Sequence, residues 1–345
     1  MPAPDQLSER ELRVLEAVVQ TYIETAEPAG SQTIARRFGL GVSPATIRST
    51  MSELEDKGYL FHPHTSAGRI PTDRAYRIYV DTIMRLSPPS HEEQKTLRAE
   101  LVGTRTVVDE VLRRAAQVLG VLTQELGVAV APALDQMVLE RLELVQVTWE
   151  RLLLVFNLRS GVVRTIFVDV SGQAPAASVQ QVAQILNERL SGLTLQEIRS
   201  TLPERLRDAS GTEGGRELLN IFIAERDGLF DLSNEDRAVV LGSAQMLADQ
   251  PEFASNSRMR DLLRLTEGRD LLKQALESRR QRGLSITIGG ENPDTRLSDF
   301  TLVTSSYEAG GLKGVIGVMG PTRMPYDKII GLVEHTSRLV EGLLE

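Results

Sequence analysis

The chain has 345 residues, of which 41% are hydrophobic and 25% are charged, so it is long enough for two or three domains with cores of their own. It contains no cysteine, which excludes disulfide bonds, thiol catalysis and cysteine-ligated zinc. The first ten residues lack the basic and apolar stretches of a secretory signal, and no segment is apolar over the length of a bilayer, so we expect a cytoplasmic protein.

The formal net charge of −8 does not favour nucleic-acid binding, but the charge is unevenly distributed. Residues 1–30 carry two arginines and six acidic residues. Residues 31–77 carry seven basic and four acidic side chains, a local net charge of +3. Because contacts between cations and phosphates supply most of the sequence-independent affinity for DNA, this modest excess predicts that tight binding needs two copies of the segment.

Three helices are predicted within the first 58 residues. The first begins with the capping-box pattern Ser8-Glu9-Arg10-Glu11, after which apolar residues recur at helical spacing. The second begins at Ser31. The third begins at Ser43, with Pro44 at the first helical position, where the missing N–H costs nothing.

The third predicted helix has two chemically different faces. Its apolar residues share one face: Ile47, Met51 and Leu54. The opposite face carries small side chains and one arginine: Ala45, Arg48, Ser49 and Ser52. A helix with such an outer face can approach base edges in the major groove closely, although a pair of helices with a turn between them is by itself a weak signal of DNA binding.

A short ribbon is predicted directly after this helix. Residues 59–61 favour a strand, residues 62–68 a tip and residues 69–71 a returning strand, and two prolines confine the ribbon to an edge or to a free-standing position. The ribbon presents His62, His64 and Arg69, for which a packed core has no evident use; the alternative is a solvated hairpin. A fourth helix, carrying Arg74, is predicted from residue 73, and the segment 86–90 favours a domain boundary.

The rest of the chain alternates between helical and strand-rich segments. Helices are predicted over residues 91–126, 178–190 and 326–344, and the composition of residues 194–282 is largely helical, with many arginines and leucines. Strands are predicted over residues 138–147, 152–158, 162–170, 284–288, 300–306 and 314–319. This order predicts an α+β protein in which an α/β domain is interrupted by a helical insert. We expect the leucines between residues 262 and 276 to form a seam for pairing.

Patterns that indicate catalysis or a cofactor are weak. The glycines between residues 310 and 320 do not match a phosphate-binding loop and run into a strand instead of opening a helix, so a glycine-rich turn and a tightly packed strand are the better interpretation. The four histidines do not have the spacing of a metal site, and no nucleophile elbow is present. Trp149, the single tryptophan, favours a core or interface position. We therefore expect neither an enzyme nor a cofactor or metal.

Residues 59–81, YLFHPHTSAGRIPTDRAYRIYVD, resemble the signature of the HrcA family, the heat-inducible transcription repressors. The segment PHTSAGRIPT at residues 63–72 is long and unusual enough to be specific. Residues 7–35, LSERELRVLEAVVQTYIETAEPAGSQTIA, are similar to the first two helices of that family. Residues 314–326, GVIGVMGPTRMPY, resemble its C-terminal signature.

The resemblance implies a dimeric repressor with an N-terminal winged helix-turn-helix domain at residues 1–88. It further implies a GAF-like domain at residues 89–193 and 283–345, and a dimerising domain inserted at residues 194–282. The implied partners are double-stranded DNA carrying an inverted-repeat operator of chaperone genes, and a GroEL-type chaperonin that maintains the active state. Heat would then act by dissociating the repressor or by drawing the chaperonin away.

On this hypothesis two protomers hold two winged helices over an inverted repeat, so that protein symmetry matches operator symmetry. The third helix would contact DNA through Ser43, Ala45, Thr46, Arg48 and Ser49. Phosphates would be bound by Arg36, Arg37, Arg69 and Arg74. The ribbon would reach the minor groove or the backbone through His62, His64 and Arg69.

Two alternatives remain open from the residues. One is a regulator that senses a small molecule through its GAF-like domain, which a buried, polar-lined pocket would favour. The other is an interaction protein whose winged helix binds protein, which would show no salt-dependent affinity for an inverted-repeat duplex.

Overall fold

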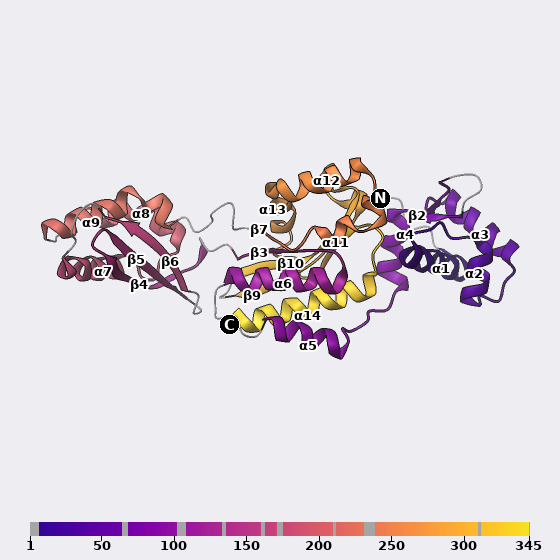
Figure 1. Cartoon of the computed structure of the whole chain (residues 1–345), viewed down its shortest axis with the longest axis horizontal. Coiled ribbons are helices and arrows are strands. Elements are labelled where there is room, and N and C mark those ends of the chain that lie inside the picture. Colours follow the sequence, from indigo (N-terminus) through magenta and orange to yellow (C-terminus); the bar gives the residue numbers. More distant parts are fainter. Residues whose placement is uncertain are drawn as a thin grey trace.

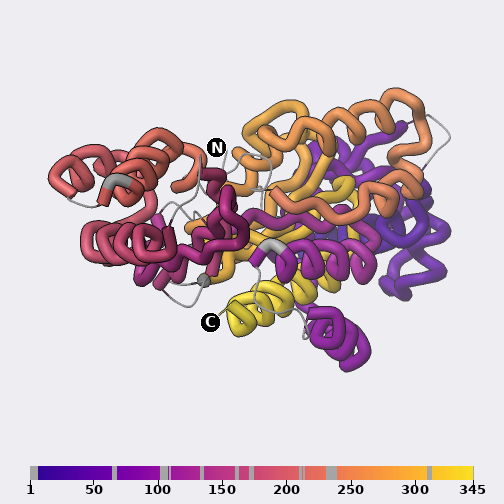
Figure 2. The backbone as a smooth tube through the Cα atoms, turned by 60° about the vertical axis from the view of Figure 1, so that its left-hand side comes forward, coloured from indigo at the N-terminus to yellow at the C-terminus, as the bar shows by residue number. Residues whose placement is uncertain are grey.

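The computed structural model describes residues 7–63, 68–101, 108–132, 136–159, 163–170, 175–209, 212–230, 239–309 and 312–344. Helices and antiparallel sheets are arranged in three units along the long axis of the molecule (Figure 1). We call them the N-terminal unit (residues 7–83), the central unit and the outer unit (between residues 136 and 230). In Figure 2, where the molecule is turned by 60° about the vertical axis, the outer unit again lies apart from the N-terminal unit.

The N-terminal unit consists of helices and one two-stranded ribbon. Its elements are α1 (Glu9–Thr25), α2 (Ser31–Phe38), α3 (Pro44–Asp56), β1 (Leu60–Phe61), β2 (Ile70–Pro71), α4 (Asp73–Ile78) and the π-helical turn η1 (Tyr79–Ile83). The capping box predicted at Ser8 and Glu11 is present, and Ser43 caps α3 with Pro44 at its first position. Buried side chains from every helix meet in one core, among them Leu15, Ile34, Ile47, Leu54 and Tyr76. The local signals predicted these helices correctly.

The central unit is built on a five-stranded antiparallel sheet with the order β7-β3-β10-β9-β8. Its strands are β3 (Leu126–Val130), β7 (Val239–Leu241), β8 (Ser285–Ile288), β9 (Phe300–Ala309) and β10 (Leu312–Pro321). Figure 1 shows helices on both faces of this sheet. On one face lie α6 (Val108–Thr123) and α14 (Tyr326–Leu344), with α5 (His91–Leu101) packed outside them; on the other lie α12 (Asn256–Glu267) and α13 (Arg269–Glu277). Short turns complete the unit: α11 (Gln245–Ala248), η4 (Pro251–Phe253), η5 (Gly289–Glu291) and η6 (Thr295–Leu297).

Two glycines allow backbone segments of the central unit to approach closely, Gly317 between the neighbouring strands β10 and β9 and Gly127 between β3 and α6. A Cβ atom at Gly317 would lie 2.1 Å from the carbonyl oxygen of Val303, and one at Gly127 would lie 1.8 Å from the carbonyl oxygen of Ala116 on α6. Neither position has room for a side chain. The glycines from residue 314 onward therefore belong to a tightly packed strand, as the sequence predicted, whereas residues 310 and 311 lie outside the described residues.

The outer unit is a three-stranded antiparallel meander with helices on one face. Its strands are β4 (Leu139–Thr148), β5 (Arg151–Leu158) and β6 (Val163–Asp169), in the order β4-β5-β6. Its helices are α7 (Ala176–Leu190), α8 (Leu195–Leu206), α9 (Glu213–Ala224) and α10 (Arg226–Phe230). Along β5, Leu152, Leu154 and Phe156 point into the core that the sheet shares with these helices. The opposite face of the sheet has no helix over it among the described residues.

The structure groups the segments differently from the predicted domain division of 89–193 plus 283–345 against 194–282. The strands between residues 139 and 169 form a sheet of their own with α7–α10, instead of joining the later strands in one sheet. Residues Leu262, Leu265, Leu272 and Leu276 are buried against the central sheet, so they do not form an exposed seam. Periodicity identifies an apolar face but not its partner, and for this reason the sequence could not assign these elements.

Candidate nucleic-acid interface

Helix α3 presents the two faces that its sequence predicted. Ile47, Met51 and Leu54 are buried, and the Oγ atom of Ser43 accepts a hydrogen bond of 3.1 Å from the backbone N–H of Thr46. Ser43, Ala45, Arg48 and Ser49 are exposed, and Thr46 is half-buried. The guanidinium of Arg48 has no hydrogen-bond or ion-pair partner among the described residues. The outer face of α3 therefore offers one uncommitted cation among small polar groups.

The C-terminal end of α3 is fixed to the start of α1 by an ion pair between a buried carboxylate and a partly exposed lysine. Glu11 has a side chain that is 7% exposed, and its Oε1 atom lies 2.6 Å from Nζ of Lys57. Burial alone raises the pKa of the Glu11 carboxyl, but the hydrogen bonds from Lys57 and Ser8 outweigh burial and hold this pKa below its ordinary value. The carboxylate is thus charged in the folded state at neutral pH.

The two arginines of α2 differ in their availability. Arg37 forms an ion pair with Glu24 of α1 and lies over the ring of Phe38, 5.4 Å from its centroid. Arg36 is exposed and has no partner among the described residues. Of this pair, Arg36 is the cation that remains available for a phosphate.

The ribbon residues are held by α3. Arg69 has a side chain that is only 14% exposed, and its Nη2 atom lies 2.8 Å from Oε2 of Glu55. His62 contacts Arg69 and lies 3.7 Å from the same carboxylate. A Cβ atom at Gly68 would lie 2.3 Å from the carbonyl oxygen of Ala29, so the backbone of the ribbon passes directly against the segment after α1. His64 lies outside the described residues.

Arg74 also serves the fold. Its Nη1 atom donates a 2.9 Å hydrogen bond to the carbonyl oxygen of Lys57, at the C-terminal end of α3. Its guanidinium lies 4.4 Å from the ring centroid of Tyr59. A cation at the end of a helix is favourable because the last carbonyl groups carry partial negative charge. Arg69 and Arg74 therefore stabilise the position of α3 and are less available for DNA than Arg36 and Arg48.

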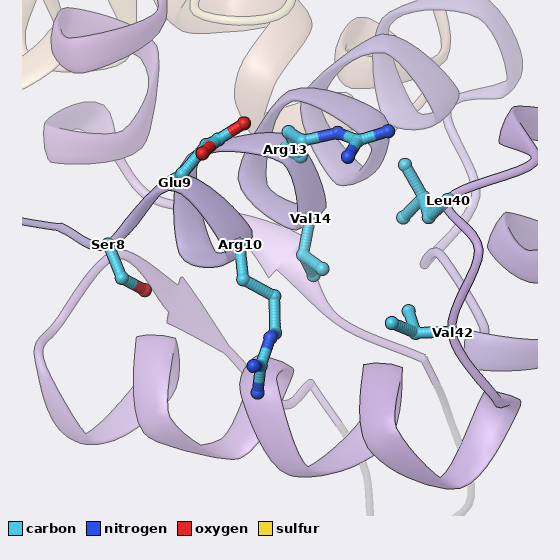
Figure 3. Close-up of a pocket in the computed structure, with 7 residues that line it drawn as sticks. All are labelled: Ser8, Glu9, Arg10, Arg13, Val14, Leu40 and Val42. Carbon is cyan, nitrogen blue, oxygen red and sulfur yellow. The ribbon is translucent and has the colours of Figure 1, made fainter.

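Two exposed arginines on α1 were not predicted to take part in binding. Arg10 and Arg13 line a pocket of about 470 Å³ together with Leu40 and Val42 of the turn that precedes α3. Figure 3 shows Arg13 extending from α1 toward Leu40. Neither arginine has a partner among the described residues. Their spacing of three residues, which places them on one side of a helix, was the signal available in the sequence.

Other kinds of site have no support in the structure. Within the described parts of the chain, no three His, Asp or Glu side chains are grouped as metal ligands. None of the helices described there has both the length and the apolar character that a bilayer span requires.

Comparison with known proteins gives one consistent result. Residues 109–330 match the family described as HrcA protein C terminal domain. The chain is 40% identical to the heat-inducible transcription repressor HrcA of Chlorobium phaeobacteroides (strain BS1), over 95% of this chain and 96% of the relative. It is 41% identical to the protein of the same name from Chlorobaculum parvum, over 95% of each chain. A solved structure described only as a hypothetical protein shares the fold, with a TM-score of 0.71 at 22% identity over 98% of this chain and 99% of that chain.

These relatives define the class of the protein: it is a transcription repressor and not an enzyme. The extent of the match, which includes both the N-terminal and the central units, decides the family. The chain belongs to the HrcA family of heat-inducible transcription repressors.

Proposed function

We propose that this repressor silences heat-shock genes by binding an inverted-repeat operator of chaperone genes as a homodimer. The N-terminal unit acts as a winged helix-turn-helix domain, in which α3 is the recognition helix and the β1–β2 ribbon is the wing. The observation that carries the proposal is Arg48, an exposed arginine without a partner among the described residues, on a face of otherwise small side chains. Arginine is the side chain best suited to bidentate recognition of guanine in the major groove.

The contacts of the other predicted residues support different roles for them. Ser43, Ala45, Thr46 and Ser49 surround Arg48 and contact base edges or the adjacent backbone. Arg36 binds phosphate directly, and Arg10 and Arg13 add charge beside the turn before α3. Arg37, Arg69, Arg74 and His62 have partners within the N-terminal unit, and they contribute chiefly by holding α3 and the ribbon in place.

The second copy required by the operator pairs through the outer unit. The uncovered face of its sheet carries a cross-strand row of Val145, Leu153 and Phe167. Val145 is 47% exposed, Phe167 is 58% exposed, and Trp149 in the adjacent turn is 59% exposed. A contiguous apolar face of this kind is typical of a protein interface, and twofold pairing would let the same face cover itself. This face replaces the leucines between residues 262 and 276 as the expected dimer interface, because Leu262, Leu265, Leu272 and Leu276 are buried in the central unit.

The central unit corresponds to the GAF-like domain of the proposal. Two pockets, of about 470 and 380 Å³, lie at the start of α1 and between α8 and α9. Neither lies at the central sheet, so these two pockets give the small-molecule sensor no specific support. Inactivation of the repressor by heat fits the words heat-inducible in the name of the relatives. We also propose a GroEL-type chaperonin that maintains the active state.

Selection of duplexes from a random pool by the native chain tests this function. We expect an inverted repeat to emerge, with an affinity that falls steeply as salt concentration rises because phosphate contacts release counterions. A chain that selects no sequence, or whose affinity does not depend on salt, would favour the protein-interaction alternative.

A further inference from the structure

Among the described residues, the helices of the N-terminal unit make polar contacts with the central unit at two points, beside the packing of Tyr76 on α4 against Tyr326, whose ring centroids are 5.8 Å apart. The first point is α4, where Arg77 forms two hydrogen bonds with the carboxylate of Glu291, one of them 2.8 Å long. The backbone N–H of Gly290 donates a 2.8 Å hydrogen bond to Asp73 on the same helix. None of these hydrogen bonds involves α1.

The second point is Arg323, which follows β10. Its Nη1 atom donates a 2.8 Å hydrogen bond to the carbonyl oxygen of Ile23, in the last turn of α1. Its Nε and Nη2 atoms bind both carboxylate oxygens of Glu252, the latter at 3.0 Å. The side chains of Arg323 and Glu252 are 14% and 26% exposed, so the pair is largely shielded from solvent. Bidentate geometry fixes direction as well as distance.

The contact with Ile23 satisfies a group that α1 cannot satisfy itself. The last carbonyl groups of a helix have no intrahelical donor, and a nearby cation stabilises them. The last turn of α1 contains no basic residue. Arg323, 300 residues away in the sequence, supplies both the donor and the charge.

Glu252 joins a third part of the chain to this contact. It lies in η4, on the segment that returns from the outer unit through β7. Two residues earlier, the Nε2 atom of Gln250 donates to the carbonyl oxygen of Gln124 at 2.8 Å and to Glu125 at 3.0 Å. The segment is therefore anchored between α6 and β3. One ion pair thus connects the end of β10, the end of α1 and the chain that comes back from the outer unit.

We propose that Arg323 and Glu252 are a positioning pair that fixes the direction in which the N-terminal unit is presented, and thereby the distance between the two half-sites that a dimer can bind. The inference rests on the proposed function, because it assumes binding to an inverted repeat. A rigid link makes the second half-site contact effectively intramolecular at one spacing only, whereas a loose link spreads it over many spacings.

The test compares three kinds of duplex: a single half-site, the inverted repeat selected by the native chain, and the same repeat with the spacer changed one base pair at a time. The variants are Arg323→Met, which keeps the bulk of the side chain, Arg323→Lys, which keeps its charge, and Glu252→Gln. Arg258→Met is the matched control, since Arg258 pairs with Asp299 within the central unit and does not touch α1.

We expect Arg323→Met to bind the half-site within about twofold of the native chain but to lose about tenfold on the best repeat, with nearly equal affinity across spacers. Arg323→Lys should keep part of the spacing preference, and Arg258→Met all of it. A merely structural role would lower affinity for half-site and repeat alike. If Arg323→Met or Glu252→Gln keeps the native spacing preference, the inference is overturned while the proposed function stands. If the native chain binds no inverted repeat, the proposed function is wrong, and the inference that rests on it is wrong as well.

A measurement without DNA complements this test. The chain has no cysteine, so Gln32→Cys on α2 and Ser257→Cys on α12 introduce two sites for spin labels in one chain. The doubly labelled chains are then diluted with unlabelled protein. The distance distribution between the labels should be narrow in the native background and broader with Arg323→Met or Glu252→Gln. A distribution that stays equally narrow in both variants overturns the inference, whether or not operator binding is detected.

Discussion

Nζ of Lys57 lies 2.6 Å from Oε1 of Glu11, and this contact joins the first turn of α1 to the residue that ends α3. The same Glu11 carboxylate accepts 2.8 Å hydrogen bonds from the backbone N–H and the hydroxyl of Ser8, which starts α1. One buried carboxylate therefore sets both where α1 begins and how it lies against α3.

We expect Glu11→Gln to lower the free energy of unfolding by about 1–2 kcal/mol at pH 7, because glutamine keeps the capping box but removes the charge that pairs with the partly exposed Lys57. The pKa of Glu11 is depressed below its ordinary value of 4.5 in the folded state. Its stabilising effect is therefore present above that value and is lost as the pH falls through the folded-state pKa. Urea denaturation over a series of pH values from 7 downward should show the difference between native and variant chains shrinking as the pH falls below 4.5; a difference that stays the same over the whole series would contradict the assignment.

Arg48→Ala should weaken binding to the selected operator by about 1–3 kcal/mol and relax base preference at one position of each half-site, if Arg48 contacts guanine. Fluorescence anisotropy with duplexes substituted at each position measures both effects. Arg264→Ala is a suitable control, because Arg264 is 79% exposed on α12, far along the chain from α3. An operator affinity that is unchanged by Arg48→Ala would mean that α3 is not the recognition helix.

Arg36→Ala should weaken binding to all sequences similarly and reduce the slope of log affinity against log salt by about 1, as expected for one lost phosphate contact. Arg37→Ala should change this slope less, because Arg37 is already paired with Glu24. The double variant Arg10→Ala, Arg13→Ala should act like Arg36→Ala if the pocket beside Leu40 faces the phosphate backbone. If Arg36→Ala and the native chain have equal slopes, Arg36 does not contact a phosphate.

Phe167→Glu should weaken dimerisation at least tenfold, because it places a charge on the uncovered apolar face of the outer unit, next to Leu153. Sedimentation velocity over a range of protein concentrations measures the shift toward monomer. Val121→Glu is the matched control, since Val121 is also largely exposed, at 55%, but lies on α6 of the central unit. If the native chain is monomeric, or if both variants dissociate equally, the outer face is not the dimer interface.

The features that the sequence predicted well depend on neighbours along the chain. The capping box at Ser8, the start of α3 at Ser43 and the two faces of α3 arise from residues within a few positions of one another. The ribbon was also predicted, but the use of its cations was not. Arg69 pairs with Glu55, and no local pattern distinguishes an arginine that binds phosphate from one that binds a carboxylate 14 residues away.

The larger errors, which concern how strands and helices are grouped, also arise because local sequence patterns do not encode contacts between distant segments. The strands between residues 139 and 169 were recognised as strands, yet their pairing with each other alone depends on contacts that period-two patterns do not encode. The leucines at 262 and 265 were recognised as an apolar face, but the sheet beneath them comes from segments before and after in the chain. The contact between Arg323 and α1 could not be found in the sequence for the same reason, because the partner of Arg323 in α1 is a backbone carbonyl.

The register of the central sheet places Val130, the last residue of β3, directly opposite Val239, the first residue of β7. The chain thus leaves the central unit for the outer unit and returns to it at adjacent positions of one antiparallel ladder. Such neighbouring ends are the geometry at which a whole unit can be inserted into, or removed from, a host fold. A tight hairpin turn joining these two positions would yield a shortened chain with an intact central sheet, so the outer unit can change in size without disturbing the strands that carry it.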